Sequence, residues 1–203
     1  MSENGKRTYT VPVLLIIIVI MSTLIVILYS KLLISQQLHT TDQGQRLAER
    51  YAYAVIFADR LHDGTDGLLI AKSEVERLRA IKLLGEATIT SSEMLGMLVE
   101  AAHLDSGLER EEAAKPLMLA VNAFMGFEGI ITKLAEHEGP LSADESASVT
   151  IIRDGAAQMK EALSRFRPPS GEAGFRQMMT IGEWIAPALE ATKSLEQIAA
   201  GLK

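Results

Sequence analysis

The chain has 203 residues, of which 48% are hydrophobic and 5% aromatic, and its formal net charge is −6. It contains no cysteine, which excludes disulfides, thiolate catalysis and cysteine-ligated zinc. The acidic balance disfavours nucleic-acid binding because phosphate backbones repel it. Ala, Leu, Ile, Met and Glu are abundant and no strand-like run is visible, so we expect an all-α fold.

An apolar run near the N-terminus predicts one transmembrane helix over residues 10–31. The eighteen residues from Val11 to Leu28 carry no charge, and with their flanks they approach the ~20 residues that a bilayer core needs. Tyrosines bracket the run, as interfacial aromatics do. The residues that mark the anchor and its ends are Tyr9, Val11, Leu28, Tyr29 and Lys31.

Two other readings of this run are a cleaved signal peptide and a buried core helix. A signal peptide would have a shorter apolar region and a small-residue cleavage site, which the sequence after Tyr29 lacks. A core helix would show a polar face. The tail of residues 1–9 is short and carries Lys6 and Arg7. We therefore expect a signal-anchor with the N-terminus inside, in a cytoplasmic (plasma) membrane that we take to be bacterial.

Beyond the membrane we expect a polar stalk over residues 32–46 and a domain over residues 47–203. A coiled-coil-like stripe begins at Leu47, and the segment from His62 to Gly67 is predicted to end this first helix. The second helix starts either near Leu68 or at Ser73, which has capping-box form with Glu76. Its inner stripe is predicted to comprise Ile81, Leu84, Thr88, Ser91, Leu95, Leu98 and Ala102.

Three further helices are predicted. The third has an ambiguous start, with a kink or restart at Pro116, and Phe127 lies on its predicted inner face. The fourth begins with a capping box at Ser142 and Glu145. The fifth is expected to kink at Pro187. Short loops between amphipathic helices favour an antiparallel up-down bundle of four to five helices, standing on the membrane.

No nucleotide-binding, zinc-protease or hydrolase motif is present, so we expect a non-enzymatic protein without a cofactor. One weak metal hypothesis remains. In an up-down bundle His62 would approach His137, with Asp66 nearby, which are ligand types that suit a transition metal. The simpler interpretation is that histidines near helix C-termini complement the helix dipole.

Two further features are candidate binding elements. Thr88, Ser91 and Ser92 interrupt the second helix and could line a ligand pocket, although such hydroxyls more often bond to their own helix. Trp184, the sole tryptophan, could contact a partner, although core packing is the better interpretation.

Two functions fit this sequence. The first is a membrane-anchored helical module that presents an extracytoplasmic interaction surface to a protein partner in the cell envelope, with self-association as a further expectation. The second is a ligand-sensing domain that signals through a separate membrane partner. The layout resembles that of bacterial chemoreceptors and sensor kinases in architecture only, because no motif is shared and no second apolar run follows.

Overall fold

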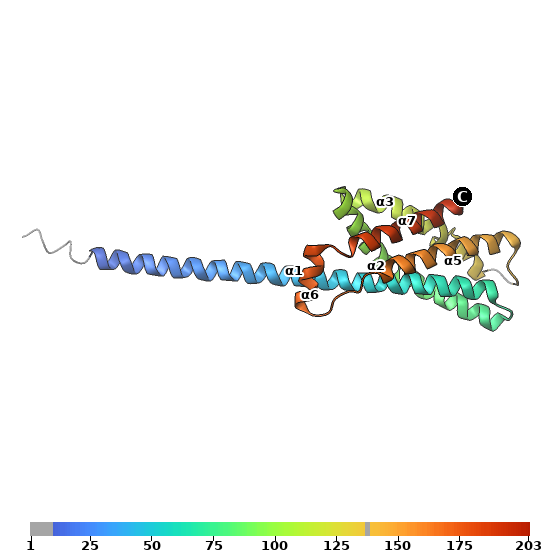
Figure 1. Ribbon diagram of the computed structural model, residues 1–203, viewed down its shortest axis with the longest axis horizontal. Coiled ribbons are helices and arrows are strands. Elements are labelled where there is room, and N and C mark those ends of the chain that lie inside the picture. The colour runs from blue at the N-terminus through green and yellow to red at the C-terminus, as the bar shows by residue number, and fades with distance from the viewer. Residues whose placement is uncertain (1–9, 137–138) are drawn as a thin grey trace, which may run out of the picture.

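The computed structural model describes residues 10–136 and 139–203, and within them the chain is all-helical, as predicted. Figure 1 shows one long helix that projects from a body made of its own second half and the other helices. The seven helices of the described residues are α1 (Thr10–Ile70), α2 (Glu74–Ser106), α3 (Arg110–Met125), α4 (Ile130–Glu136), α5 (Ala143–Ser164), α6 (Glu172–Ile181) and α7 (Ile185–Gly201).

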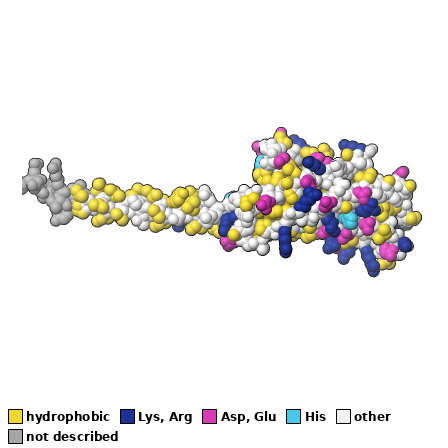
Figure 2. Space-filling view, viewed as in Figure 1, with side chains coloured by type: hydrophobic (Ala, Val, Ile, Leu, Met, Phe, Trp, Pro, Cys, Tyr) yellow, Lys and Arg dark blue, Asp and Glu magenta, His cyan; other side chains and the backbone are white. Residues whose placement is uncertain are grey.

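The projecting part of α1 is an apolar helix with no protein surface against it. Residues 11–39 are all exposed, and Figure 2 shows hydrophobic side chains along this part while charged ones gather on the body. This part is long and apolar enough to cross a membrane. A second stretch, Arg110–Leu134, passes the same test of length and composition, but it spans α3 and α4 and is partly buried in the body. Tyr9 lies outside the described residues.

The predicted stalk is a continuation of α1 and is partly covered by protein. Thr41 and Gly44 are buried, so the segment over residues 32–46 that was predicted as a polar stalk is regular helix and meets protein toward its C-terminal end. The reason is the close approach of α6: Arg176 Nη1 donates to Thr41 Oγ1 at 3.0 Å. A Cβ atom at Gly44 would overlap the Phe175 carbonyl oxygen. The missing side chain therefore allows α6 to lie against α1 where α1 enters the body.

The predicted helix end between His62 and Gly67 is wrong, because α1 runs through both glycines to Ile70. A Cβ atom would lie 2.7 Å from Leu84 Cδ2 if added at Gly64, and 3.1 Å from Ala80 Cβ if added at Gly67. The glycines thus serve close contact with α2 rather than a turn. The Thr65 hydroxyl donates to the Leu61 carbonyl at 2.7 Å and is satisfied inside the helix.

The second helix begins at the later of its two predicted starts. Ser73 is the N-cap, and its hydroxyl accepts the Glu76 N–H at 3.4 Å. The Glu76 carboxylate accepts the Lys72 N–H at 2.7 Å, which holds the pKa of Glu76 below its ordinary value. Only residues 71–73 separate α1 from α2, and these two helices share the most extensive contact in the body.

The core lies between α1, α2, α5 and α7, along the predicted first stripe. Leu47, Tyr51, Ala54, Ala58 and Leu61 are all buried, which confirms that stripe. The Tyr51 hydroxyl donates to the Leu163 carbonyl at 2.8 Å, and its ring packs edge-on against Phe166. Burial raises the pKa of Tyr51 above its ordinary value, so the hydroxyl stays a donor.

The predicted third helix is divided. It begins at Arg110 and passes Pro116 without a restart, but it ends at Met125, and α4 follows at Ile130. A Cβ atom at Gly129 would lie 2.6 Å from the Phe124 carbonyl, so the chain folds tightly back at this break. Phe127 lies in the break and is 89% exposed, which contradicts its predicted place on the inner face.

The predicted start of the fourth helix is confirmed, whereas the predicted kink in the fifth is not. The capping box at Ser142 and Glu145 is present and begins α5. The kink expected at Pro187 is replaced by a break at Gly182, which adopts φ 71°. Pro187 then falls in the first turn of α7, where a missing N–H leaves no hydrogen bond unmade.

The contact at Gly44 yields a stability prediction. Gly44→Ala should destabilise the protein by about 1–3 kcal/mol, because the added Cβ meets backbone that has no rotamer to change. The matched control is Gly85→Ala on the open face of α2, where nothing lies within 4 Å and helix propensity favours alanine by up to ~1 kcal/mol. Thermal unfolding of detergent-solubilised full-length protein measures both. Equal stability of the two variants would contradict the close packing of α6.

The turn between α2 and α3 yields a pH prediction. Arg110 donates to both carboxylate oxygens of Glu100, at 2.7 and 2.9 Å, and this lowers the pKa of Glu100 from 4.5. A depressed folded-state pKa gives stability that is complete above the unfolded pKa and is lost as the pH falls through the folded pKa. Glu100→Gln should therefore flatten the loss of stability below about pH 4.5.

The control for this pH dependence is Glu93→Gln, which removes a single 3.2 Å hydrogen bond with Arg50. Denaturant titrations across the acid range should show the smaller change for Glu93→Gln. If Glu100→Gln loses stability at acid pH in the same way as the wild type, the ion pair between Glu100 and Arg110 is not a source of the pH dependence.

Candidate binding site

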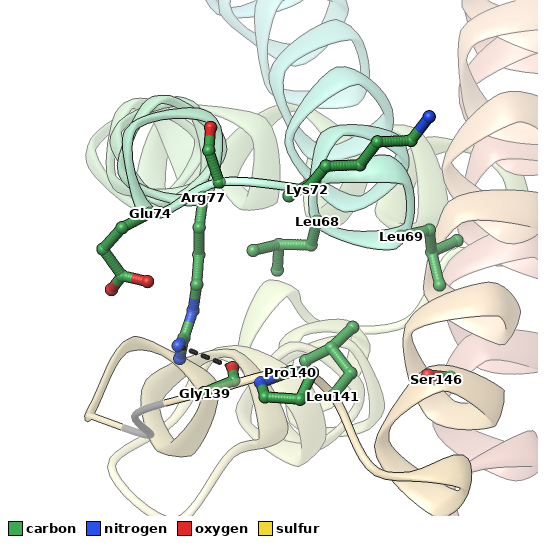
Figure 3. Close-up of a pocket in the computed structure, with 11 residues that line it drawn as sticks. Leu68, Leu69, Lys72, Glu74, Arg77, Gly139, Pro140, Leu141 and Ser146 are labelled. Atoms are coloured by element: carbon green, nitrogen blue, oxygen red, sulfur yellow. Dashed lines mark hydrogen bonds between the residues drawn. The ribbon is translucent and has the colours of Figure 1, made fainter.

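The candidate site is a hollow at the end of the body where α1 gives way to α2, which we call the distal end (Figure 3). Its volume is about 420 Å³, within the range of small-molecule sites. Residues from the end of α1, the start of α2, the segment before α5 and the first turns of α5 line it. They are Leu68, Leu69, Ala71, Lys72, Ser73, Glu74, Arg77, Gly139, Pro140, Leu141 and Ser146.

Arg77 is the central polar group of the hollow. It lies one turn into α2 and is only 7% exposed. Its Nη1 donates to the Gly139 carbonyl at 2.9 Å and its Nη2 to the Leu134 carbonyl at 3.0 Å. The Leu134 carbonyl belongs to the last turn of α4, where helices leave acceptors without an internal partner. Arg77 therefore ties the end of α4 and the segment before α5 to α2.

The charge of Arg77 is uncompensated within the described residues. None of the ion pairs in this part of the chain involves Arg77. Its Nε atom is buried and has no hydrogen-bond partner there. A buried guanidinium that meets only neutral carbonyls is unfavourable, since carbonyl dipoles do not replace a counter-charge.

The surroundings of Arg77 divide into a polar rim and an apolar wall. Lys72 and Glu74 are exposed at the rim, and the N-terminus of α2 adds partial positive charge. Leu68, Leu69 and Leu141 form the apolar side, and Figure 3 shows them across the hollow from the Arg77 side chain. A buried guanidinium facing an apolar wall is an arrangement that suits the binding of a small ligand.

The metal hypothesis gains no geometric support. His62 Nδ1 lies 3.1 Å from Asp63 Oδ1, and Asp66 lies 3.9 Å from Arg153 Nη1. No group of three or more His, Asp or Glu side chains in residues 10–136 and 139–203 could hold a metal ion. His137 falls outside the described residues.

The hydroxyls of the second helix are used within that helix. Thr88 donates to the Leu84 carbonyl at 3.0 Å, and Ser91 to the Thr88 carbonyl at 2.7 Å. Thr88 borders a smaller hollow of about 180 Å³ that is mainly apolar, whereas Ser91 and Ser92 do not line it. Only one of the three predicted residues thus reaches a hollow.

Trp184 is part of the core. It is 1% exposed, and its indole N–H donates to the Met178 carbonyl at 3.2 Å. Trp184 lies in the break between α6 and α7 and packs in the core, which is the interpretation that the sequence favoured.

Arg77 was missed by the sequence analysis, although a signal existed. The buried positions of α2 include Arg77, Ala80, Leu84 and Ala87, spaced 3, 4 and 3. The predicted stripe shared only Leu84 and Leu98 with the buried face. Four of its other members, Ile81, Thr88, Leu95 and Ala102, each lie one residue after a buried position, so Arg77 was not recognised as an inward-facing charge. An arginine on an apolar stripe is the pattern that could have located the site.

Comparison with protein-family models, with curated proteins and with solved structures returned no match to this chain.

The role of Arg77 yields a stability prediction. Arg77→Ala should destabilise the protein by about 2–4 kcal/mol, because it leaves two carbonyls without donors and opens a cavity. Arg79→Ala, on the exposed face of the same turn, is the control and should stay within about 0.5 kcal/mol of wild type. Chemical unfolding measures both, and similar values for the two variants would refute the structural role of Arg77.

Proposed function

We propose that this chain is a non-enzymatic, single-pass membrane protein that holds a helical domain outside the cytoplasm and presents it to a protein partner in the cell envelope. The observation that carries the proposal is the division of α1. Its first part is apolar and fully exposed over residues 11–39, and its second part is the central helix of the body. Lipid is the natural cover for such an exposed apolar span.

The orientation and topology are part of the same proposal. Lys6 and Arg7, in a short tail, favour a cytoplasmic N-terminus in a bacterial plasma membrane. We further propose that the body helices form an antiparallel up-down bundle. The three-residue connection over 71–73 and the extensive contact between α1 and α2 support this arrangement.

Exposed apolar side chains on α3 and in the break after it support the interaction role. Met118, Leu119 and Phe127 are large apolar side chains that are 52%, 72% and 89% exposed, and no charged residue falls between Pro116 and Phe127. Exposed apolar residues that occur close together are typical of surfaces that bind another protein, including a second copy of the same chain.

A second candidate function, ligand sensing through a separate membrane partner, is favoured by the position of the hollow. Leu68 and Leu69 line the hollow and belong to α1, the helix that also forms the membrane span. A change of packing at the distal end would act on the same rigid element that enters the lipid.

The orientation can be tested with single cysteines, because the chain has none of its own. Ser92→Cys places a thiol on the exposed surface of α2, and Ser2→Cys places one in the N-terminal tail. A membrane-impermeant maleimide applied to intact cells should label Ser92→Cys and should label Ser2→Cys only after lysis. The reverse pattern would place the domain in the cytoplasm, and labelling of neither cysteine before lysis would also contradict the proposal.

A further inference from the structure

We propose that the distal hollow binds a small organic anion, with a carboxylate against Arg77 and an aliphatic body against Leu68, Leu69 and Leu141. This inference rests on the ligand-sensing alternative above, since it names the ligand class for that role. Binding itself does not require either membrane orientation, so a failed binding test would leave the labelling result standing.

The first argument is the donor capacity of Arg77. A guanidinium has five N–H donors, and two neutral carbonyls are its hydrogen-bond partners in the described residues. The Nε donor is buried without a partner. A carboxylate matches the fork of a guanidinium and supplies the missing counter-charge. Arg77 thus provides the polar half of the site.

The second argument is the local charge. Lys72 adds a positive charge at the rim, and the N-terminus of the 33-residue α2 adds a partial one. Glu74 is the opposing carboxylate among the lining residues. Glu76 is already hydrogen-bonded to the Lys72 N–H. Among the lining residues Lys72 and Arg77 exceed Glu74 by one positive charge, which a single negative charge on a ligand would balance.

The third argument is the size of the hollow and the apolar wall on one side of it. About 420 Å³ accommodates a compact ligand. The leucines offer aliphatic contact across the hollow from the Arg77 side chain, and Pro140 adds apolar surface next to Gly139. An inorganic anion would leave the apolar wall exposed to water. A short-chain carboxylate would cover the wall, and its binding would be strengthened by the burial of apolar surface. We therefore infer an organic carboxylate rather than phosphate.

The experiment compares butyrate, butyramide and inorganic phosphate on full-length protein in detergent at constant ionic strength. Butyramide has nearly the same shape as butyrate but carries no charge. Calorimetry or ligand-detected NMR should show butyrate binding at least about tenfold tighter than either comparator, as the loss of a charge-assisted hydrogen bond or of apolar burial implies. If butyrate binds no more tightly than butyramide, the proposed role of Arg77 is wrong. If butyrate binds no more tightly than phosphate, the proposed contribution of the apolar wall to binding is wrong.

A second experiment tests whether butyrate binds in the distal hollow. It leaves Arg77 unchanged, because replacement of Arg77 is expected to destabilise the body. Ser146 lines the hollow from α5, so the larger side chain in Ser146→Phe should fill the hollow. The control is Ala147→Phe, which places the same side chain at the next position, where it is exposed and does not line the hollow. Butyrate binding should weaken about tenfold or more in Ser146→Phe and stay unchanged in Ala147→Phe, with both variants matching wild type in helicity. No detectable butyrate binding to the wild-type protein, or full binding to a folded Ser146→Phe variant, would refute the proposal.

Discussion

The structure depends on the continuity of α1, because this one helix has two parts of different character. Its first part has apolar side chains on every face and no protein against them in the described residues, a surface whose exposure to water is unfavourable and which lipid would cover. Its second part is amphipathic, with α2, α5 and α6 packed on it. Over 61 residues the helix measures about 90 Å, and no kink-forming residue interrupts the region between the two environments. The other helices are arranged around the second half of α1, three of them in direct contact with it.

Glycines that permit close packing explain why this helix was predicted in pieces. From sequence, Gly64 and Gly67 beside two aspartates look like a turn, because glycine and aspartate are common in turns. In the structure the same glycines lie against Leu84 and Ala80 of α2. Gly155 serves α5 in the same way, since a Cβ atom there would overlap Ile198. Local propensity cannot distinguish these roles, because the deciding contact comes from a helix distant in sequence.

The parts that were predictable have local causes. The capping box at Ser142 and the cap at Ser73 involve residues within one turn, and the seam that includes Tyr51 repeats along a single helix. The candidate site depended on longer-range relations. Arg77 faces inward because α4 and the segment before α5 supply carbonyl acceptors, and that need is not visible within α2 itself. The break at Gly182 and the inward turn of Trp184 likewise follow from the packing of α6 on α1.

The position of Arg77 places a buried charge, without an ion-pair partner in residues 10–136 and 139–203, next to the end of the helix that would span the membrane under the proposal above. The hollow lies where α1 ends, so an anion that binds Arg77 would also contact leucines of α1 on its apolar side. Binding would relieve a buried charge and stabilise the arrangement of α1, α2 and the segment before α5 by an amount that grows with ligand concentration. A ligand changes an equilibrium only if it contacts two conformations differently. A carboxylate ligand would favour the conformation in which Arg77 faces the hollow, because it would satisfy the Nε donor that is buried there without a partner in the described residues. The bonds from Arg77 to the carbonyls of Leu134 and Gly139 would meanwhile keep the connection between α4, the segment before α5 and α2 in place.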